Sequence, residues 1–135
     1  DATFAKIKDQ FKAGCLSEDE ILTTIKTCFN ETGYLLDTHT AIGYGVLKQY
    51  QQETGDHTKT VLLSTASPYK FPESVYQAIY GEELDVYTAI DKLSEKTGVP
   101  VPQALAGIKE REVLHKEAID KTEIISFIKS EIDAM

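Results

Sequence analysis

A short apolar run, Val61-Leu62-Leu63, constrains the fold of this chain more than any other stretch. A continuous run of this kind is typical of a strand that is covered on both faces of a sheet. A strand cannot satisfy its own backbone hydrogen-bonding groups, so it needs partner strands. Either a weak strand elsewhere in the chain pairs with residues 61–64, or the partners lie outside this sequence. The lack of a second clear strand favours the latter and predicts a fragment.

The residues that follow this run predict a ligand site. Residues 64–67 are small, and three of them carry hydroxyl groups at the carboxyl end of the predicted strand, where open α/β sheets bind ligands. Lys70 comes next, and Pro72 suits the first turn of a helix whose amides would face the same crevice. Simpler interpretations remain open, since Thr65 and Ser67 could close a turn and Lys70 could be a solvated charge.

Helices are predicted through most of the remaining chain. Ser17 and Glu20 form a capping box, and Gly33 is a typical helix end. Gly43 and Gly45 each cost a helix roughly 1 kcal/mol relative to Ala, so we interpret them as points where another backbone or a ligand packs closely. The helices that we expect span approximately residues 3–13, 17–32, 38–53, 72–80, 85–98, 102–109 and 120–135.

The composition excludes several classes of partner. The formal net charge is −8 and the pI is about 4.8, which disfavours non-specific binding to nucleic acid or to an anionic membrane. No window approaches the ~18 consecutive apolar residues of a membrane span, and the sequence has no signal-peptide pattern, so we expect a cytoplasmic protein. Cys15 and Cys28 fit no zinc or C-x-x-C pattern, and we expect reduced, structural thiols.

A group of polar residues marks the start of the predicted helix 38–53. His39 lies beside Asp37 and Thr40. These residues either cap the helix or line a site, and both interpretations remain open. The three histidines share no metal-like spacing. The sequence contains no Ser-His-Asp order, Walker loop or glycine-rich phosphate motif.

Two segments together resemble threonine synthase. Asp37-Thr-His-Thr-Ala-Ile-Gly43 resembles the D-P-H-T-A-V-G stretch of that family, with Thr38 in place of the usual proline. Ser64-Thr-Ala-Ser-Pro-Tyr-Lys-Phe71 resembles its T-A-(H/S)-P-x-K-F segment, at about the right separation. The resemblance covers roughly residues 14–135, the C-terminal part of the enzyme. Further stretches that fit are Gly33-Tyr34, Pro72-Glu73-Ser74-Val75 and Gly98-Val-Pro-Val-Pro102.

The resemblance implies an α/β fold class and a reaction. The chain would be the mostly helical C-terminal portion of a tryptophan-synthase-β-like (fold type II) pyridoxal-phosphate enzyme. Its buried strand would join a sheet from the missing N-terminal part of the same polypeptide, so that residues 1–135 form a single region of a larger catalytic domain. Such an enzyme is a lyase of threonine biosynthesis that converts O-phospho-L-homoserine and water to L-threonine and phosphate.

The same resemblance implies roles for five residues. Thr65 would hydrogen-bond the pyridine nitrogen of pyridoxal phosphate. Lys70 and Ser67 would contribute to substrate binding, Lys70 by helping to hold the substrate phosphate, and Asp37 and His39 would border the substrate site. The Schiff-base lysine and the glycine-rich cofactor loop of the family have no match here, so we expect no catalytic residue in this chain and no activity from it alone.

Two alternatives belong to other classes. The chain could be a free-standing, non-catalytic module that binds a small anion or a partner protein. It could also be an inert fragment whose exposed strand edges promote self-association.

Overall fold

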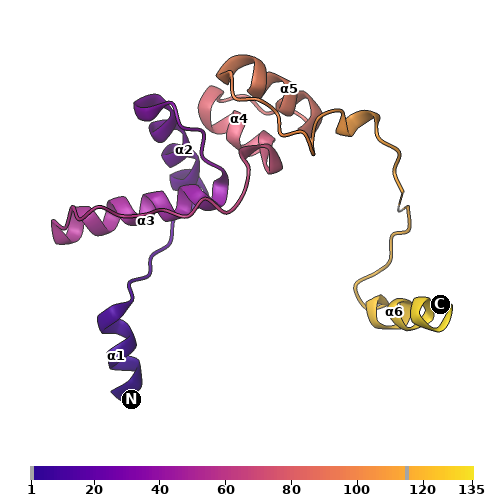
Figure 1. Cartoon of the computed structure of the whole chain (residues 1–135), viewed down its shortest axis with the longest axis horizontal. Helices are drawn as coiled ribbons and strands as arrows, with labels where there is room; N and C mark the ends of the chain where they lie inside the picture. Colours follow the sequence, from indigo (N-terminus) through magenta and orange to yellow (C-terminus); the bar gives the residue numbers. More distant parts are fainter. Residues whose placement is uncertain (1, 115) are drawn as a thin grey trace.

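The computed structural model describes residues 2–114 and 116–135. Among these residues, every regular secondary-structure element is a helix. The predicted helices are confirmed within a few residues, except for 102–109, which forms turns and a short 3-10 helix. The elements are α1 (Ala2–Gln10), α2 (Glu18–Thr32), α3 (Thr38–Thr54), η1 (Pro68–Lys70), α4 (Pro72–Tyr80), α5 (Val86–Thr97), η2 (Ile108–Glu110) and α6 (Ile124–Asp133) (Figure 1).

Side-chain caps fix where the helices begin. The predicted capping box is present at α2, where Ser17 accepts from the Glu20 amide and Glu20 accepts from the Ser17 amide. Asp37 caps α3 and Asp85 caps α5, each through two backbone amides. These caps satisfy amide groups that a helix leaves unpaired in its first turn.

Four helices form the packed core. α2 packs against both α3 and α4, and α4 packs against α5 (Figure 1). The residues that follow α5 contact η1, because the Tyr69 hydroxyl donates a hydrogen bond to the Val99 carbonyl. Apolar side chains of these helices are fully or almost fully buried, as their amphipathic spacing requires. The core residues include Ile25, Cys28, Leu36, Ala41, Val75, Tyr76, Ala89, Ile90 and Leu93.

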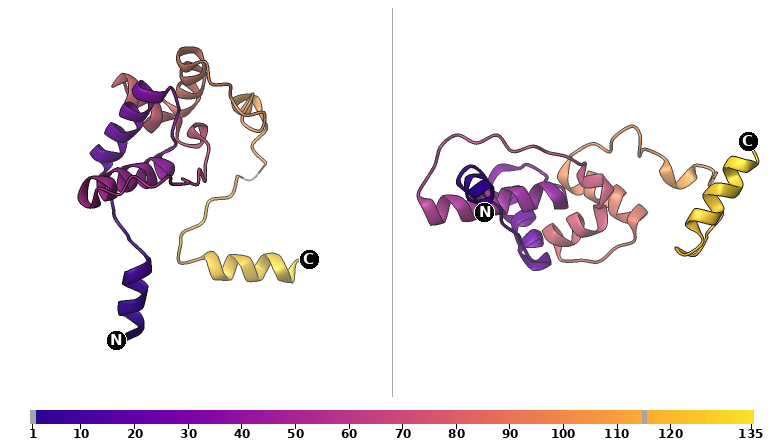
Figure 2. Two further views of the ribbon diagram at one scale, coloured as in Figure 1. Left: turned by 60° about the vertical axis from the view of Figure 1, so that its left-hand side comes forward. Right: turned by 90° about the horizontal axis from the view of Figure 1, so that it is seen from below.

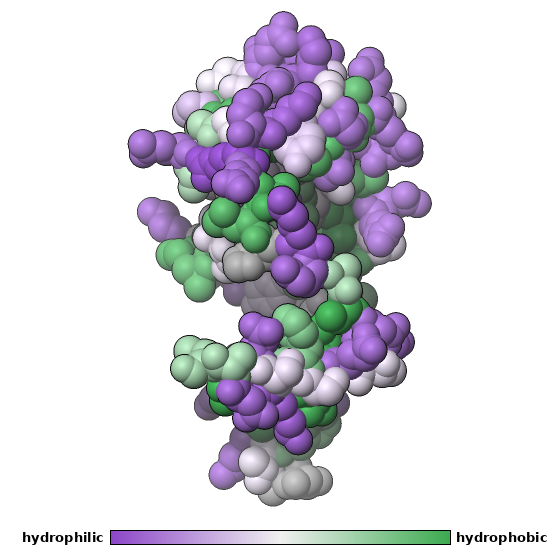
Figure 3. All heavy atoms as spheres, turned by 90° about the vertical axis from the view of Figure 1, so that its right-hand side faces the viewer, coloured by the Kyte–Doolittle hydropathy of each residue, from purple (hydrophilic) through white to green (hydrophobic). Residues whose placement is uncertain are grey.

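The terminal helices α1 and α6 lie apart from this core (Figures 1 and 2). Their apolar stripes, Phe4 and Ile7 on α1 and Ile125 and Ile132 on α6, are exposed. The side of the molecule that carries α6 shows apolar residues among hydrophilic ones (Figure 3). None of the described helices combines the length and the apolar character that crossing a bilayer requires.

The prediction of a buried strand at residues 61–64 is wrong for this structure. Val61 and Leu63 are 83% and 76% exposed, and the segment has no strand assignment. Within the described part of the chain, residues 59–66 form no backbone-to-backbone hydrogen bond. The physical reason is the one that made the strand an orphan in the sequence: an extended segment without a partner has no ladder to join.

The segment nevertheless has a defined position along α3. It runs back beside that helix towards its N-terminus (Figures 1 and 2). Leu62 packs so closely on Gly43 that a Cβ at this glycine would lie 2.9 Å from Leu62 Cδ1. A close approach at Gly43 is therefore present, but the Leu62 side chain makes it, and not the backbone or ligand that we expected.

Candidate functional site

The N-terminus of α3 forms one half of the candidate site. Asp37 is 1% exposed, and its Oδ1 accepts from the amides of His39 at 2.9 Å and Thr40 at 3.1 Å. Its Oδ2 accepts from the Thr40 hydroxyl. Both carboxylate oxygens are therefore engaged within α3. The capping interpretation of Asp37 describes this geometry.

His39 is the exposed member of this half. Its Nδ1 lies 3.7 Å from Asp37 Oδ1, an ion pair when the ring is protonated. The ring also packs on Phe71, with centroids 4.9 Å apart. Because Phe71 follows η1, this contact joins the two segments that resemble threonine synthase. The imidazole keeps one edge open, with 60% of its side chain exposed.

A second contact joins the two segments through hydroxyl groups. Thr40 Oγ1 and Ser64 Oγ lie 3.4 Å apart, a long hydrogen bond between residues 24 positions apart in the chain. The first half of the site therefore contacts the second at its start, through Ser64, and at its end, through Phe71.

The second half of the site carries the remaining predicted residues. Thr65 and Lys70 are exposed, and neither side chain has a hydrogen-bond or ion-pair partner among the described residues. Ser67 is half-buried and caps η1, because its Oγ accepts from the Tyr69 amide at 3.2 Å. The structure thus brings the neighbourhoods of all five predicted residues together, and it shows local structural roles for Asp37 and Ser67.

Thr40, Ser64 and Phe71 make these contacts, and the sequence alone predicted no individual site role for any of the three. The signal for the first two was present, since Thr40 lies one position after His39 and Ser64 one position before Thr65. Phe71 carried no comparable signal, because an apolar residue between a lysine and a proline is an ordinary core candidate.

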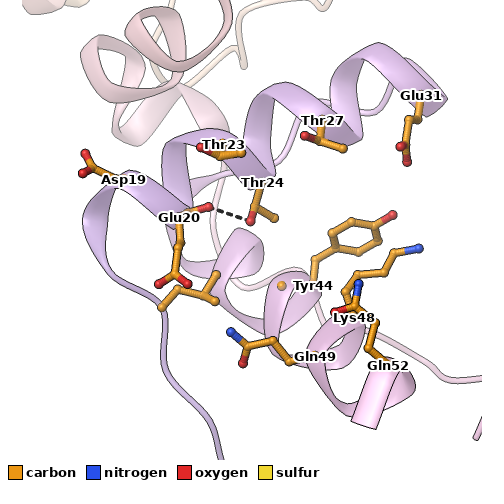
Figure 4. A pocket seen from close by; sticks show the side chains of 12 residues that line it. Asp19, Glu20, Thr23, Thr24, Thr27, Glu31, Tyr44, Lys48, Gln49 and Gln52 are labelled. Carbon is orange, nitrogen blue, oxygen red and sulfur yellow. Dashed lines mark hydrogen bonds between the residues drawn. The ribbon is translucent and has the colours of Figure 1, made fainter. Parts of the chain in front are cut away.

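A groove of about 530 Å³ lies elsewhere, between α2 and α3. None of the five predicted residues lines it. Glu20 is already engaged in the capping box, and hydrogen bonds from Ser17 hold its pKa below the ordinary value of 4.5. Lys48 lies over the Tyr44 ring (Figure 4). With Asp19 and Glu31 also on its wall, the groove suits an anionic substrate poorly.

Three comparisons relate the chain to known proteins. A family described as "Threonine synthase, C-terminal" matches residues 40–128. Threonine synthase-like 1 of Mus musculus is 32% identical over 111 residues, which cover 79% of this chain and 14% of that protein. Threonine synthase of Haemophilus influenzae is 40% identical over 82 residues, or 59% of this chain and 18% of that enzyme.

A solved structure is similar as well. The crystal structure of PLP-bound threonine synthase from Brucella melitensis superposes with a TM-score of 0.56 and 32% identity, over 80% of this chain and 19% of that one. The chain spans less than a fifth of the length of each of these three proteins. Because the family match covers residues 40–128, more than half of the sequence, the chain belongs to the threonine synthase family and corresponds to its C-terminal region.

Proposed function

We propose that this chain contributes one wall of the active site of a threonine synthase, which converts O-phospho-L-homoserine and water to L-threonine and phosphate. The observation that carries the proposal is the contact between the two family segments, through Thr40 and Ser64 and through His39 and Phe71. Two segments that resemble the same enzyme meet in space and leave a hydroxyl, an imidazole and an ammonium group open.

The open residues fit part of pyridoxal phosphate. The Thr65 hydroxyl is exposed and unpartnered among the described residues, with the small side chain of Ala66 beside it, so it is free to hydrogen-bond the pyridine nitrogen. Pyridoxal phosphate, when bound, supplies an electron sink for carbanion chemistry. A neutral hydroxyl at the ring nitrogen leaves it less firmly protonated than a carboxylate would. The lysine and the phosphate loop that the cofactor also needs are expected in the remainder of the polypeptide.

The other residues bind and orient the substrate in this proposal. Lys70 holds the substrate phosphate, since an ammonium group forms charge-assisted hydrogen bonds with phosphate oxygens. Ser67 orients the turn that carries Lys70. Asp37 fixes the first turn of α3 and so presents His39 at the border of the site.

Segment 61–67 needs a structural partner from outside the described residues. Its residues 61–66 form no backbone-to-backbone hydrogen bond within the described part of the chain, and the apolar side chains of Val61 and Leu63 face solvent. In the larger catalytic domain we expect the segment to pair with a sheet from the rest of the polypeptide, which would bury both side chains.

The complete gene product that carries these residues provides the test. Lys70→Ala should raise the KM for O-phospho-L-homoserine about tenfold, because one charge-assisted contact to the phosphate is lost. Lys26→Ala is the matched control, since Lys26 is an exposed lysine on α2. Absence of phosphate release by the wild-type protein with pyridoxal phosphate would refute the proposed function, and an unchanged KM would refute the role of Lys70.

The chain of 135 residues alone should neither shift the absorbance of pyridoxal phosphate nor release phosphate from O-phospho-L-homoserine. The second candidate, a non-catalytic anion-binding module, is favoured by one observation: Lys70 is exposed and unpaired beside the start of α4. Titration of the chain with inorganic phosphate distinguishes the two. Saturable chemical-shift changes at Lys70 in the absence of other polypeptide would favour the module.

A further inference from the structure

We propose that Thr40 is a positioning residue that sets the register of segment 61–67 against α3 and thereby the direction of the Thr65 side chain. The inference deepens the proposed function, and its importance for catalysis rests on that function. It depends on two contacts between α3 and the segment, at Ser64 and at Leu62.

The first contact is a chain of hydroxyl groups that ends on a buried carboxylate. Thr40 has one hydroxyl proton, and a bond to a carboxylate is stronger than a bond to a neutral hydroxyl. The proton therefore goes to Asp37 Oδ2, and Ser64 donates to Thr40 Oγ1 across the 3.4 Å that separates the oxygens. Since Thr40 is 4% exposed and Asp37 1%, these two hydrogen bonds fix Ser64 to a rigid part of the core.

The second contact lies one turn further along α3. Gly43 follows Thr40 by three residues, about 4.5 Å of helix rise, while Leu62 precedes Ser64 by two residues, about 6.6 Å of extended chain. The two spacings are similar, and the segment runs antiparallel to α3, so both contacts can form at the same time. Any side chain larger than hydrogen at Gly43 would meet Leu62. Together the contacts define a unique register.

The register matters because an extended chain alternates its side chains between two faces. Leu62 and Ser64 face α3, so Leu63 and Thr65 face away, in agreement with their exposure. A slip by one residue would turn Thr65 towards α3. Residues 61–66 form no backbone-to-backbone hydrogen bond within the described part of the chain that would oppose such a slip, so before the segment joins a sheet its register depends on Thr40 and Gly43.

Hydrogen exchange in the complete gene product, without cofactor or substrate, tests the register directly. Ser64→Ala removes the donor and leaves the Asp37–Thr40 bond intact, so amides of 61–67 should exchange about fivefold faster, the worth of one hydrogen bond. The first turn of α3 should be unchanged. Thr40→Val should speed exchange of the segment equally, and Thr40→Ser should restore it. Thr54→Val, on the last turn of the same helix, is the control.

A double variant separates a shared link from two independent effects. Thr40→Val with Ser64→Ala should exchange in the segment no faster than Thr40→Val alone, because both substitutions break one interaction. An unchanged segment in Ser64→Ala, a multiplicative effect in the double variant, or failure of Thr40→Ser to restore protection would each overturn the proposal.

Kinetics then connect the register with the site. If Thr65 meets the cofactor, Ser64→Ala should weaken pyridoxal-phosphate binding, followed by fluorescence titration, and lower kcat more than it raises the KM for O-phospho-L-homoserine. Fast exchange of the segment with unchanged cofactor affinity and kinetics would overturn the link to Thr65. A wild-type protein without cofactor binding would refute the proposed function instead, and the exchange data would still decide the register.

Discussion

The N-terminus of α3 and segment 61–67 face each other across the candidate site, yet different interactions hold them. At α3, Asp37 is buried and accepts from three donors, and every later turn closes its own hydrogen bonds. Segment 61–67 exposes Val61 and Leu63, and its residues 61–66 form no backbone-to-backbone hydrogen bond within the described part of the chain. A helix supplies its own backbone partners, whereas an extended segment must obtain them from another strand. The α3 half of the site therefore satisfies its own backbone hydrogen-bonding groups, whereas segment 61–67 does not.

The largest expected effect separates the core from the segment. Leu93→Ala, at a site that is 0% exposed, should lower the free energy of unfolding by about 2–5 kcal/mol. Leu63→Ala, at a site that is 76% exposed, should change it by less than about 0.5 kcal/mol. Urea unfolding of this chain measures both. A large loss for Leu63→Ala would show that the segment is packed in solution and would break the comparison.

The next effect compares two aspartate caps. Asp37→Ala should cost about 2 kcal/mol and Asp85→Ala about 1 kcal/mol, because Asp37 is buried and also accepts from the Thr40 hydroxyl, whereas Asp85 is exposed and accepts from the amides of Tyr87 and Thr88. The difference between the two urea midpoints is the measurement. Equal losses would mean that the buried hydroxyl contact adds nothing to the cap.

Two glycines of α3 sharpen the comparison further. Alanine gains about 1 kcal/mol over glycine in a helix. At Gly45 the new Cβ would lie 2.4 Å from Leu16 Cδ1 and 3.2 Å from Thr24 Oγ1, so overpacking should outweigh that gain by about 1 kcal/mol. At Gly43 only Leu62 is met.

The Leu62 side chain can turn aside without a shift of the segment's backbone, so Gly43→Ala should leave the chain at least as stable as wild type. Thermal melts of the two variants, with Leu62→Ala as background control, test this difference. A loss at Gly43→Ala as large as at Gly45→Ala would indicate that the Leu62 side chain cannot turn aside.

The smallest expected effect is a decrease of the melting temperature at acidic pH. Hydrogen bonds from Thr88 hold the pKa of Asp85 below its ordinary value of 3.8, and hydrogen bonds with Thr58 do the same for the pKa of Asp56 at the start of the extended region. A lowered folded-state pKa stabilises the fold above the unfolded value and loses that contribution as the pH falls through the folded one. The melting temperature should therefore decline below pH 3.8, and Asp85→Asn should decline less. A flat profile in the wild type would contradict this expectation.

Most of the helical architecture could be predicted from the sequence, because its signals are local. Ser17, Asp37 and Asp85 mark helix starts through bonds to amides two or three residues away, and Gly33 marks an end through its positive φ of 74°. The error at residues 61–64 has the opposite origin. An apolar run predicts burial, but burial of a strand depends on a partner that no local pattern supplies.

The sequence predicted which residues belong to the candidate site better than it predicted which of them are in contact. The two family segments could be identified from their residues, and the expected neighbourhood of His39 and Thr65 followed from them. The pairings of Thr40 with Ser64 and of His39 with Phe71 depend on how the chain returns along α3, which the sequence does not encode within either segment.

The packing of α2 has a consequence for how the chain can be divided. α2 contacts α3, which precedes the extended segment, and α4, which follows it. The connection between residues 59 and 66 is therefore not what keeps α4 and α5 beside α2. A protease cut there would leave two pieces that remain associated through the α2–α4 contact, and the two pieces produced separately should reassemble into the same helical core, as a split-protein pair.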